Sequence, residues 1–437
     1  MARLNTANKN TAKTHEGGPA IGHVKPLAQL RRSVLSCLLW EKEFYEDGQS
    51  IADRIVETAR KVKPADLAAV AIEARKVFNL RHVPLLLLDV LSETVEGRSL
   101  LAETVSRVVS RADEMGELLT VYWRNGRKSV PRQMRKGLGR ALIKFDEYQL
   151  AKYDRDDGVK LRDVLRIARP KPTSDEQAAL WKRAKDRSLA TPDTWEVALS
   201  GGANKGETFA RLIREGNLGY LALLRNLRNM EKAGVDRKLI SEAIVARKNG
   251  AQRVLPFRYV AAARAVPSFE PALDQALCEA ISELPPLPGH TIVLVDVSQS
   301  MDAKLSAKSD LTRLDAAAAL GAIVQGDLKL FTFSYEIVEV PPRRGMAGVE
   351  AIVKSQSHGG TYLGAALTVI NKIKHDRLIV ITDEQTADRA PSPKAKHAYM
   401  INVASAKNGV GYGNGWTHID GFSEGVLRFI HELENFD

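Results

Sequence analysis

The sequence is poor in cysteine and has no long hydrophobic run. Only Cys37 and Cys278 occur in 437 residues, and no Cys-x-x-Cys pair exists, so neither a disulfide framework nor a cysteine-ligated zinc site is indicated. We expect two buried thiols in a reducing compartment, with a disulfide between them as the alternative. No apolar run approaches the length of a membrane span, and the polar first ten residues lack a hydrophobic signal region. These absences predict a soluble cytoplasmic protein that does not bind membranes.

Catalytic motifs are also missing. Gly421–Gly425 has the Gly-x-Ser-x-Gly pattern of hydrolases, but only His431 follows it, on the same terminal helical segment. Gly201–Gly206 contains a lysine among glycines but lacks the Gly-Lys-Ser/Thr of a phosphate-binding loop. No His-Glu-x-x-His occurs, so a zinc hydrolase is not indicated either. We therefore expect a protein that is not an enzyme.

What the chain has in excess is positive charge, and this charge is unevenly distributed. The whole chain carries 64 Lys and Arg against 53 Asp and Glu, a net charge of +11. From Pro288 to the end there are 15 basic and 17 acidic residues, so the first 287 residues hold a net +13. A basic region beside a neutral one indicates a polyanionic partner for the basic region.

Periodicity divides the chain into a helical part and an α/β part. Residues 1–24 are small and polar and are expected to be flexible, whereas residues 25–284 show serial helical patterns of about 12 to 18 residues, an α-solenoid arrangement. Windows such as 98–120, 219–232 and 256–283 each predict one helix. After a proline-rich joint, residues 288–437 alternate strand and helix patterns, which predicts a doubly wound parallel sheet.

The ends of the predicted strands carry oxygen ligands for a metal. The strand Thr291–Val295 is followed by an Asp-x-Ser-x-Ser turn, and later segments supply a threonine on a glycine-rich turn and an acid at the end of the strand Leu378–Ile381. Ligands of α/β sheets bind at the carboxyl ends of strands. Carboxylate and hydroxyl oxygens suit Mg²⁺ rather than zinc. The predicted Mg²⁺ ligands are Asp296, Ser298, Ser300, Thr361 and Asp383.

Basic side chains cluster in the segment 124–144, which contains no acid. Four of them are spaced three to four residues apart after Pro131 and would share one face of a helix, where like charges repel unless an anion is present. A merely solvated helical face is the alternative. The candidate phosphate-binding residues, including two further along the chain, are Arg124, Arg127, Lys128, Arg132, Arg135, Lys136, Arg140, Lys152 and Arg169. Tyr148 and Tyr153 are either stacking platforms for bases or core aromatics.

The chain resembles the Ro autoantigen family of TROVE-domain RNA-binding proteins. The Asp-x-Ser-x-Ser and Thr361 motifs match the metal-ion-dependent adhesion site of von Willebrand A domains. Several short stretches of the helical part also match the family, namely 27–32, 46–48, 126–128, 136–141, 150–153, 161–165, 170–172 and 223–227. Lys152 matches a basic RNA contact of the family, and Arg169 stands where animal members have a histidine.

This resemblance implies a specific architecture and role. Residues 25–284 would form a TROVE domain, a closed ring of HEAT-like helical repeats, and residues 288–437 a von Willebrand A-like domain that bridges its ends. The family binds small noncoding Y RNA on a basic outer surface and single-stranded 3′ ends of misfolded RNA in the ring cavity. The implied role is RNA quality control, with an exoribonuclease as a protein partner in bacteria.

Two further function classes compete with this ribonucleoprotein, which we expect to be a monomer. In one, the chain is a protein-interaction scaffold whose Mg²⁺ site captures a carboxylate of an acidic partner. In the other, it is a nuclease, but the serine-rich ligation of one metal argues against two-metal chemistry.

Overall fold

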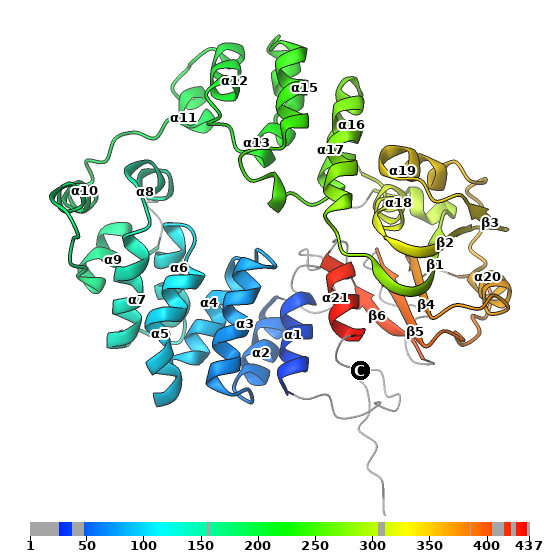
Figure 1. The fold of residues 1–437 in the computed structure, drawn as a ribbon, viewed down its shortest axis with the longest axis horizontal. Coiled ribbons are helices and arrows are strands. Elements are labelled where there is room, and N and C mark those ends of the chain that lie inside the picture. The colour runs from blue at the N-terminus through cyan, green and yellow to red at the C-terminus, as the bar shows by residue number, and fades with distance from the viewer. Residues whose placement is uncertain are drawn as a thin grey trace, which may run out of the picture. The chain divides into compact units, whose positions relative to one another are not determined.

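The computed structural model describes residues 26–36, 48–154, 158–304, 311–384, 386–403, 415–420 and 425–434. They form two compact units (Figure 1). One, the helical unit, comprises Pro26–Lys42, Glu46–Ala276 and Gly425–Asp437; the other, the α/β unit, contains Leu277–Glu424. The predicted change from helices to alternating strands and helices is confirmed, since α17 (Glu270–Ser282) is followed by β1 (Leu287–Asp296).

The helical unit contains short helices that pack pairwise through apolar faces. Before α17, its helices are α1 (Pro26–Ser36), α2 (Gly48–Ala59), α3 (Pro64–Lys76), α4 (His82–Leu91), α5 (Val95–Val108), α6 (Asp113–Tyr122), α7 (Arg132–Leu142), α8 (Glu147–Tyr153), α9 (Leu161–Ala168), α10 (Asp175–Asp186), α11 (Trp195–Ser200), α12 (Lys205–Arg214), α13 (Tyr220–Arg225), α14 (Leu227–Lys232), α15 (Arg237–Ala246) and α16 (Phe257–Ala265). In the described part of the chain none of the helices is long and apolar enough to cross a membrane.

Three predicted helices are each divided in the structure. The window 98–120 becomes α5 and α6, 219–232 becomes α13 and α14, and 256–283 becomes α16 and α17. Asn226 ends α13 and begins α14; its side-chain amide donates to the carbonyl of Ala222, 2.9 Å away. Pro267 separates α16 from α17, because proline cannot supply the backbone N–H that a helix interior needs. Apolar periodicity continues across such breaks, so it overestimated the helix lengths.

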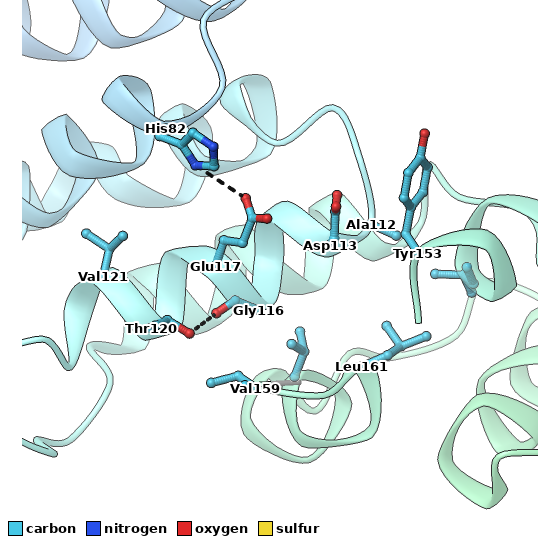
Figure 2. A pocket seen from close by; sticks show the side chains of 13 residues that line it. His82, Ala112, Asp113, Gly116, Glu117, Thr120, Val121, Tyr153, Val159 and Leu161 are labelled. Atoms are coloured by element: carbon cyan, nitrogen blue, oxygen red, sulfur yellow. Dashed lines mark hydrogen bonds and ion pairs between the residues drawn. The ribbon is translucent and has the colours of Figure 1, made fainter. Parts of the chain in front are cut away.

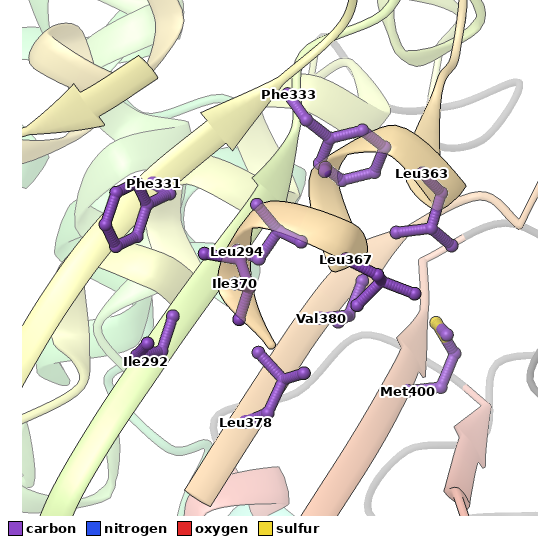
Figure 3. Close-up of a cluster of buried hydrophobic side chains, with 11 residues drawn as sticks. Ile292, Leu294, Phe331, Phe333, Leu363, Leu367, Ile370, Leu378, Val380 and Met400 are labelled. Carbon is purple, nitrogen blue, oxygen red and sulfur yellow. The ribbon is translucent and has the colours of Figure 1, made fainter. Parts of the chain in front are cut away.

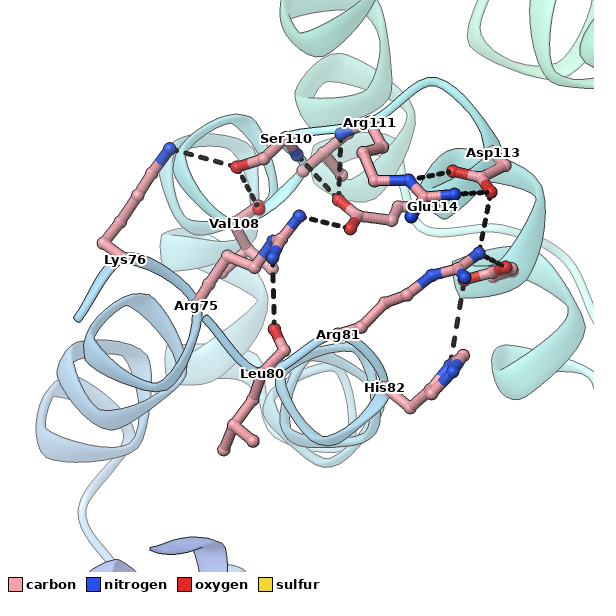
Figure 4. A network of polar contacts seen from close by, with 12 residues as sticks. Arg75, Lys76, Leu80, Arg81, His82, Val108, Ser110, Arg111, Asp113 and Glu114 are labelled. Carbon is pink, nitrogen blue, oxygen red and sulfur yellow. Dashed lines mark hydrogen bonds and ion pairs between the residues drawn. The ribbon is translucent and has the colours of Figure 1, made fainter. Parts of the chain in front are cut away.

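A buried ion-pair network fixes the turn between α5 and α6 (Figure 4). The Glu114 carboxylate is fully buried, accepts hydrogen bonds from the backbone N–H groups of Ser110 and Arg111 at 2.7 and 3.0 Å, and pairs with Arg75 of α3. Beside it, Arg81 bridges Asp113 and Glu117 of α6. Buried charges are tolerated when they are paired and hydrogen-bonded in this way, so the network ties α3, α4 and α6 together.

The C-terminal helix α21 (Gly425–Glu434) packs with the helical unit. Arg31 of α1 lies between Glu432 of α21 and Glu73 of α3, with N–O distances of 3.1 and 2.7 Å. Val426 and Ile430 of α21 are fully buried. The sequence analysis had grouped this helix with residues 288–437, whereas its contacts are with the first helices of the chain.

The α/β unit is built on a mixed sheet of six strands among its described residues, in the order β3-β2-β1-β4-β5-β6. Only β3 runs antiparallel to its neighbour, and this edge strand was not predicted. Beyond β1, the strands are β2 (Gly326–Phe333), β3 (Ile337–Val340), β4 (Arg377–Thr382), β5 (His397–Asn402) and β6 (Thr417–Asp420), with helices α18 (Arg313–Ile323), α19 (Gly345–Val353) and α20 (Leu363–Ile370). The strand order reverses between β1 and β4, and ligands of such sheets bind at the carboxyl ends of the strands there.

The core of this unit lies between the sheet and α20 (Figure 3). Ile292 and Leu294 of β1 and Leu378 and Val380 of β4 are fully buried, and Leu367 of α20 packs among them. Burying each such side chain contributes about 1.5–3 kcal/mol. This packing fixes β1 and β4 side by side, and with them the acids that follow each strand.

Candidate functional site

Helix α7 presents the four regularly spaced cations to solvent. Its other face, with Met134, Leu138, Ala141 and Leu142, is fully buried. A Cβ on Gly137 would lie 2.7 Å from the Cβ of Val105, so α7 approaches α5 at a distance that only glycine permits. Because this face is held against α5, the opposite face is exposed, as the spacing predicted; it carries Arg132, Arg135, Lys136 and Arg140.

The exposed face of α7 forms one wall of a cavity of about 730 Å³, which we call the α7–α9 groove. The other wall is Ile167–Lys171, at the end of α9 and just beyond it. Six cations line the groove and no acid does: Arg132, Arg135, Lys136, Arg140, Arg169 and Lys171. Arg169 is far from α7 in sequence, so the fold unites two separately predicted parts of the basic set.

Little negative charge offsets these cations. Among the described residues only Arg140 has an ion-pair partner, Glu103, at 3.3 Å, and both side chains are largely exposed. Such exposed pairs contribute about 0–1 kcal/mol. The first turn of α7 has no acidic residue and no side-chain cap, although the N-terminal end of a helix is itself positive. The groove therefore concentrates positive potential and would favour an anion.

Arg169 reaches the groove through an unusual backbone. It ends α9 in the left-handed conformation, with φ 45° and ψ 55°, and its N–H donates to the carbonyl of Leu165 at 3.0 Å. Left-handed residues other than glycine, asparagine and aspartate are uncommon and strained. This turn directs Pro170 toward α7, where a Cβ on Gly139 would lie 3.5 Å from the proline Cβ.

Three other predicted phosphate-binding residues lie on the segment before α7, outside the groove lining. Arg124 and Lys128 both approach Asp89 of α4, at 3.1 and 3.8 Å, and the Asp89 side chain is only 5% exposed. Burial raises the pKa of Asp89, and the two cations oppose that rise. Arg127 instead stacks on Trp123, 4.9 Å from the ring. Arg124 and Lys128 therefore compensate a buried carboxylate within the fold.

Lys152 lies on α8 among aromatic rings rather than in the groove. Its ammonium is 5.4 Å from the Tyr148 ring and 5.9 Å from the Tyr153 ring. Tyr148 is 39% exposed, so one of its faces is open to a ligand. Tyr153 is half-buried and has Arg111 over its ring at 4.4 Å.

A second cavity, of about 390 Å³, lies between α4, α6, α8 and α9 (Figure 2). Its polar wall includes Asp113 and Glu117, both paired with Arg81, and His82 lies 3.8 Å from Glu117. Its apolar wall includes Val159 and Leu161. The sequence analysis did not anticipate this cavity, because its lining comes from four separate segments with no shared motif.

The predicted metal ligands gather at the carboxyl ends of β1 and β4. Asp296 is fully buried, and its carboxylate accepts hydrogen bonds from the Ser298 N–H at 2.9 Å and the Thr382 hydroxyl at 2.6 Å. The hydroxyls of Ser298 and Ser300 are 3.2 Å apart. Backbone bonding of Gln299 to Gly359, at 2.9 Å, brings the glycine-rich turn that carries Thr361 to the same edge.

The chemistry of this donor set fits a hard cation. Burial raises the pKa of Asp296 to about 7, hydrogen bonds from Ser298 and Thr382 oppose the rise, and the charge of Asp383 adds to it. Asp383 is fully buried and pairs with Arg313 at 3.2 Å. In the described ranges no three His, Cys, Asp or Glu side chains are grouped to hold a metal, so a site here depends on the hydroxyl oxygens. Thr382 and Arg313 were not predicted as part of it.

Comparisons with known proteins agree with this fold and extend it. Residues 181–316 match the model of the TROVE domain. The crystal structure of the Ro (RSR) protein of Deinococcus radiodurans superposes with a TM-score of 0.68 over 93% of this chain and 98% of that one, at 19% sequence identity. That likeness is one of fold.

Two curated relatives share sequence over a shorter stretch. Telomerase protein component 1 of Mus musculus is 30% identical over 110 residues, and that of Rattus norvegicus is 29% identical over 110 residues. The alignments cover 24% of this chain but only 4% of either relative. The α7–α9 groove precedes the residues matched by the TROVE model, so its assignment depends on the geometry described above.

Proposed function

We propose that this chain, whose TROVE-domain match and fold support membership of the Ro/TROVE family, is an RNA-binding protein that holds phosphates in the α7–α9 groove. The observation that carries the proposal is the union of six cations from two segments around one cavity with no acidic lining residue. Arginine and lysine bind RNA phosphates with release of counterions, so affinity should be largely electrostatic.

The finer features of the family are part of the same proposal. The helical unit would form a HEAT-like ring, the α/β unit a von Willebrand A domain, and Mg²⁺ would be held by Asp296, Ser298, Ser300, Thr361 and Asp383. The RNA would be a Y-like noncoding RNA on the outer surface or the 3′ end of a misfolded RNA in the ring. The protein would act as a cytoplasmic monomer, without catalysis of its own, in RNA quality control with an exoribonuclease partner.

A charge-reversal experiment tests the groove. Changing Arg135 and Lys136 to Glu should weaken binding of a structured RNA at least tenfold, because each phosphate contact contributes to the salt-dependent affinity. The matched control reverses Lys182 and Lys185 of α10, two exposed lysines outside the groove lining. Titrations at several salt concentrations should show log K falling less steeply in the groove variant, by about 0.7 per lost contact to a single strand. Equal affinities of the two variants would contradict the proposal.

The protein-interaction scaffold remains the second candidate. The convergence of Asp296, Ser298 and Ser300 at the sheet edge favours it, because a serine-rich site leaves a bound cation with net positive charge for a partner's carboxylate. Ser298→Ala should leave RNA binding unchanged if the groove is the RNA site. Loss of RNA binding in this variant would shift the RNA site toward the α/β unit.

A further inference from the structure

The α7–α9 groove is not uniformly polar. Between its cations lie four apolar residues that the charge pattern did not suggest: Ile143, Ile167, Ala168 and Pro170. Ile143, immediately after α7, is 43% exposed in the described structure. Leaving such a side chain exposed forgoes part of the roughly 1.5–3 kcal/mol that burying it would contribute. The groove thus combines an apolar surface with cationic walls.

This combination has a different ligand preference from a cationic surface alone. An RNA double helix presents phosphates and 2′-hydroxyls outward, while its bases are stacked inside, so it has no flat apolar face to place on Ile143 or Pro170. An unpaired nucleotide offers both a phosphate and a free base face. The volume of about 730 Å³ falls within the range of pockets that enclose small ligands, which are about 300–1,000 Å³.

We propose that the α7–α9 groove binds an unpaired segment of RNA, with a base against Ile143 and Pro170 and the flanking phosphates on the cations of α7 and on Arg169. The inference rests on the proposed function, since it takes the groove as an RNA site, and it adds which form of RNA the groove selects. Ile143 then determines specificity, and the cations determine affinity. The absence of an acidic lining residue lets successive phosphates approach both walls.

An anisotropy titration compares a labelled 12-nucleotide RNA that cannot self-pair with a blunt duplex of the same length. Wild type should bind the single strand more tightly than the duplex. Ile143→Ser should weaken single-strand binding about fivefold, roughly 1 kcal/mol, and leave duplex binding unchanged. Val95→Ser is the matched control, because Val95 is 82% exposed and lies outside the groove lining.

A second variant gives the opposite sign. Ile143→Trp enlarges the apolar surface and adds a ring for stacking, so it should tighten single-strand binding, an effect that misfolding cannot produce. Melting curves followed by circular dichroism would show that each variant is folded.

The outcomes distinguish this inference from the proposed function. If reversing Arg135 and Lys136 weakens both RNAs while the Ile143 variants change neither, the groove is an RNA site without preference for unpaired nucleotides, and the inference is wrong. If the charge reversal weakens neither RNA, the proposed function itself fails. Displacement of the single strand by an equal concentration of a glutamate-rich peptide would overturn the inference in favour of an acidic protein ligand.

Discussion

Arg124 neutralises the buried carboxylate of Asp89, with 3.1 Å between its Nη1 and the Asp89 Oδ2. Lys128 is the second cation at this carboxylate, at 3.8 Å. A cation that compensates a buried acid supports the fold whether or not RNA is present. The basic segment 124–144 therefore contains two kinds of residue, those that pair internally and those that line the groove.

Arg124→Ala should lower the free energy of unfolding by about 2 kcal/mol. Breaking a buried ion pair costs about 3–5 kcal/mol, and the remaining Lys128 should reduce that loss. Adding Asp89→Asn should restore much of the stability, because the uncompensated charge is removed. Urea denaturation measures both effects. Arg127→Ala is the control, since Arg127 stacks on Trp123, and equal losses in the two single variants would contradict the role of Asp89.

Arg169→Gly should separate stability from binding. Glycine adopts the left-handed conformation without strain, so the variant should be as stable as wild type or more stable, by up to about 1 kcal/mol. RNA affinity should nevertheless fall, because one groove cation is lost. Arg187, with φ 58°, ends α10 in the same conformation but lies outside the groove lining, which makes Arg187→Gly the matched control. A loss of affinity as large in the control would contradict a specific role for Arg169.

Lys144 should give the protein a pH-dependent stability. Its ammonium donates hydrogen bonds to the carbonyls of Ser106 and Val109 at the end of α5. Burial of the ammonium lowers its pKa to about 8, and the charge of Lys76 lowers it further. The unfolded chain, with an ordinary lysine pKa of about 10.4, keeps its proton to higher pH. Between these two values the unfolded state binds more protons, so stability rises with pH.

The corresponding measurement compares wild type with Lys144→Met. The difference in unfolding free energy, wild type minus variant, should increase between pH 8 and pH 10 and stay constant below pH 7. Urea denaturation at three pH values suffices. A flat difference across the whole range would show that the pKa of Lys144 is not lowered.

Mg²⁺ should stabilise the α/β unit through the hydroxyl ligands. After removal of metal with a chelator, added Mg²⁺ should raise the melting temperature, because a ligand that binds only the folded state adds about 2.7 kcal/mol at one hundred times its dissociation constant. Ser298→Ala and Thr361→Ala should reduce that rise. Thr368→Ala, which removes an exposed hydroxyl on α20 that bonds to Gly364, should not. A rise that persists in all three variants would indicate a different cation site.

Local patterns predicted the elements better than their limits. The β-branched run of β1 and the spacing of cations on α7 led directly to a buried strand and an exposed basic face, since both depend on short-range periodicity. The breaks at Asn226 and Pro267 and the edge strand β3 were missed. A helix break keeps the apolar face of its neighbours, and a four-residue edge strand has too few residues to show alternation.

The candidate sites divide in the same way. The sequence by itself determined which groups could act, because the Asp-x-Ser-x-Ser turn and the cations of α7 are contiguous in the chain. Only the tertiary structure decided which groups act together. Packing of β1 against β4 brings Thr382 to Asp296, the left-handed turn after α9 brings Arg169 to α7, and Asp89 withdraws Arg124 to an internal pair. Such pairings depend on contacts between distant segments, which no local pattern encodes.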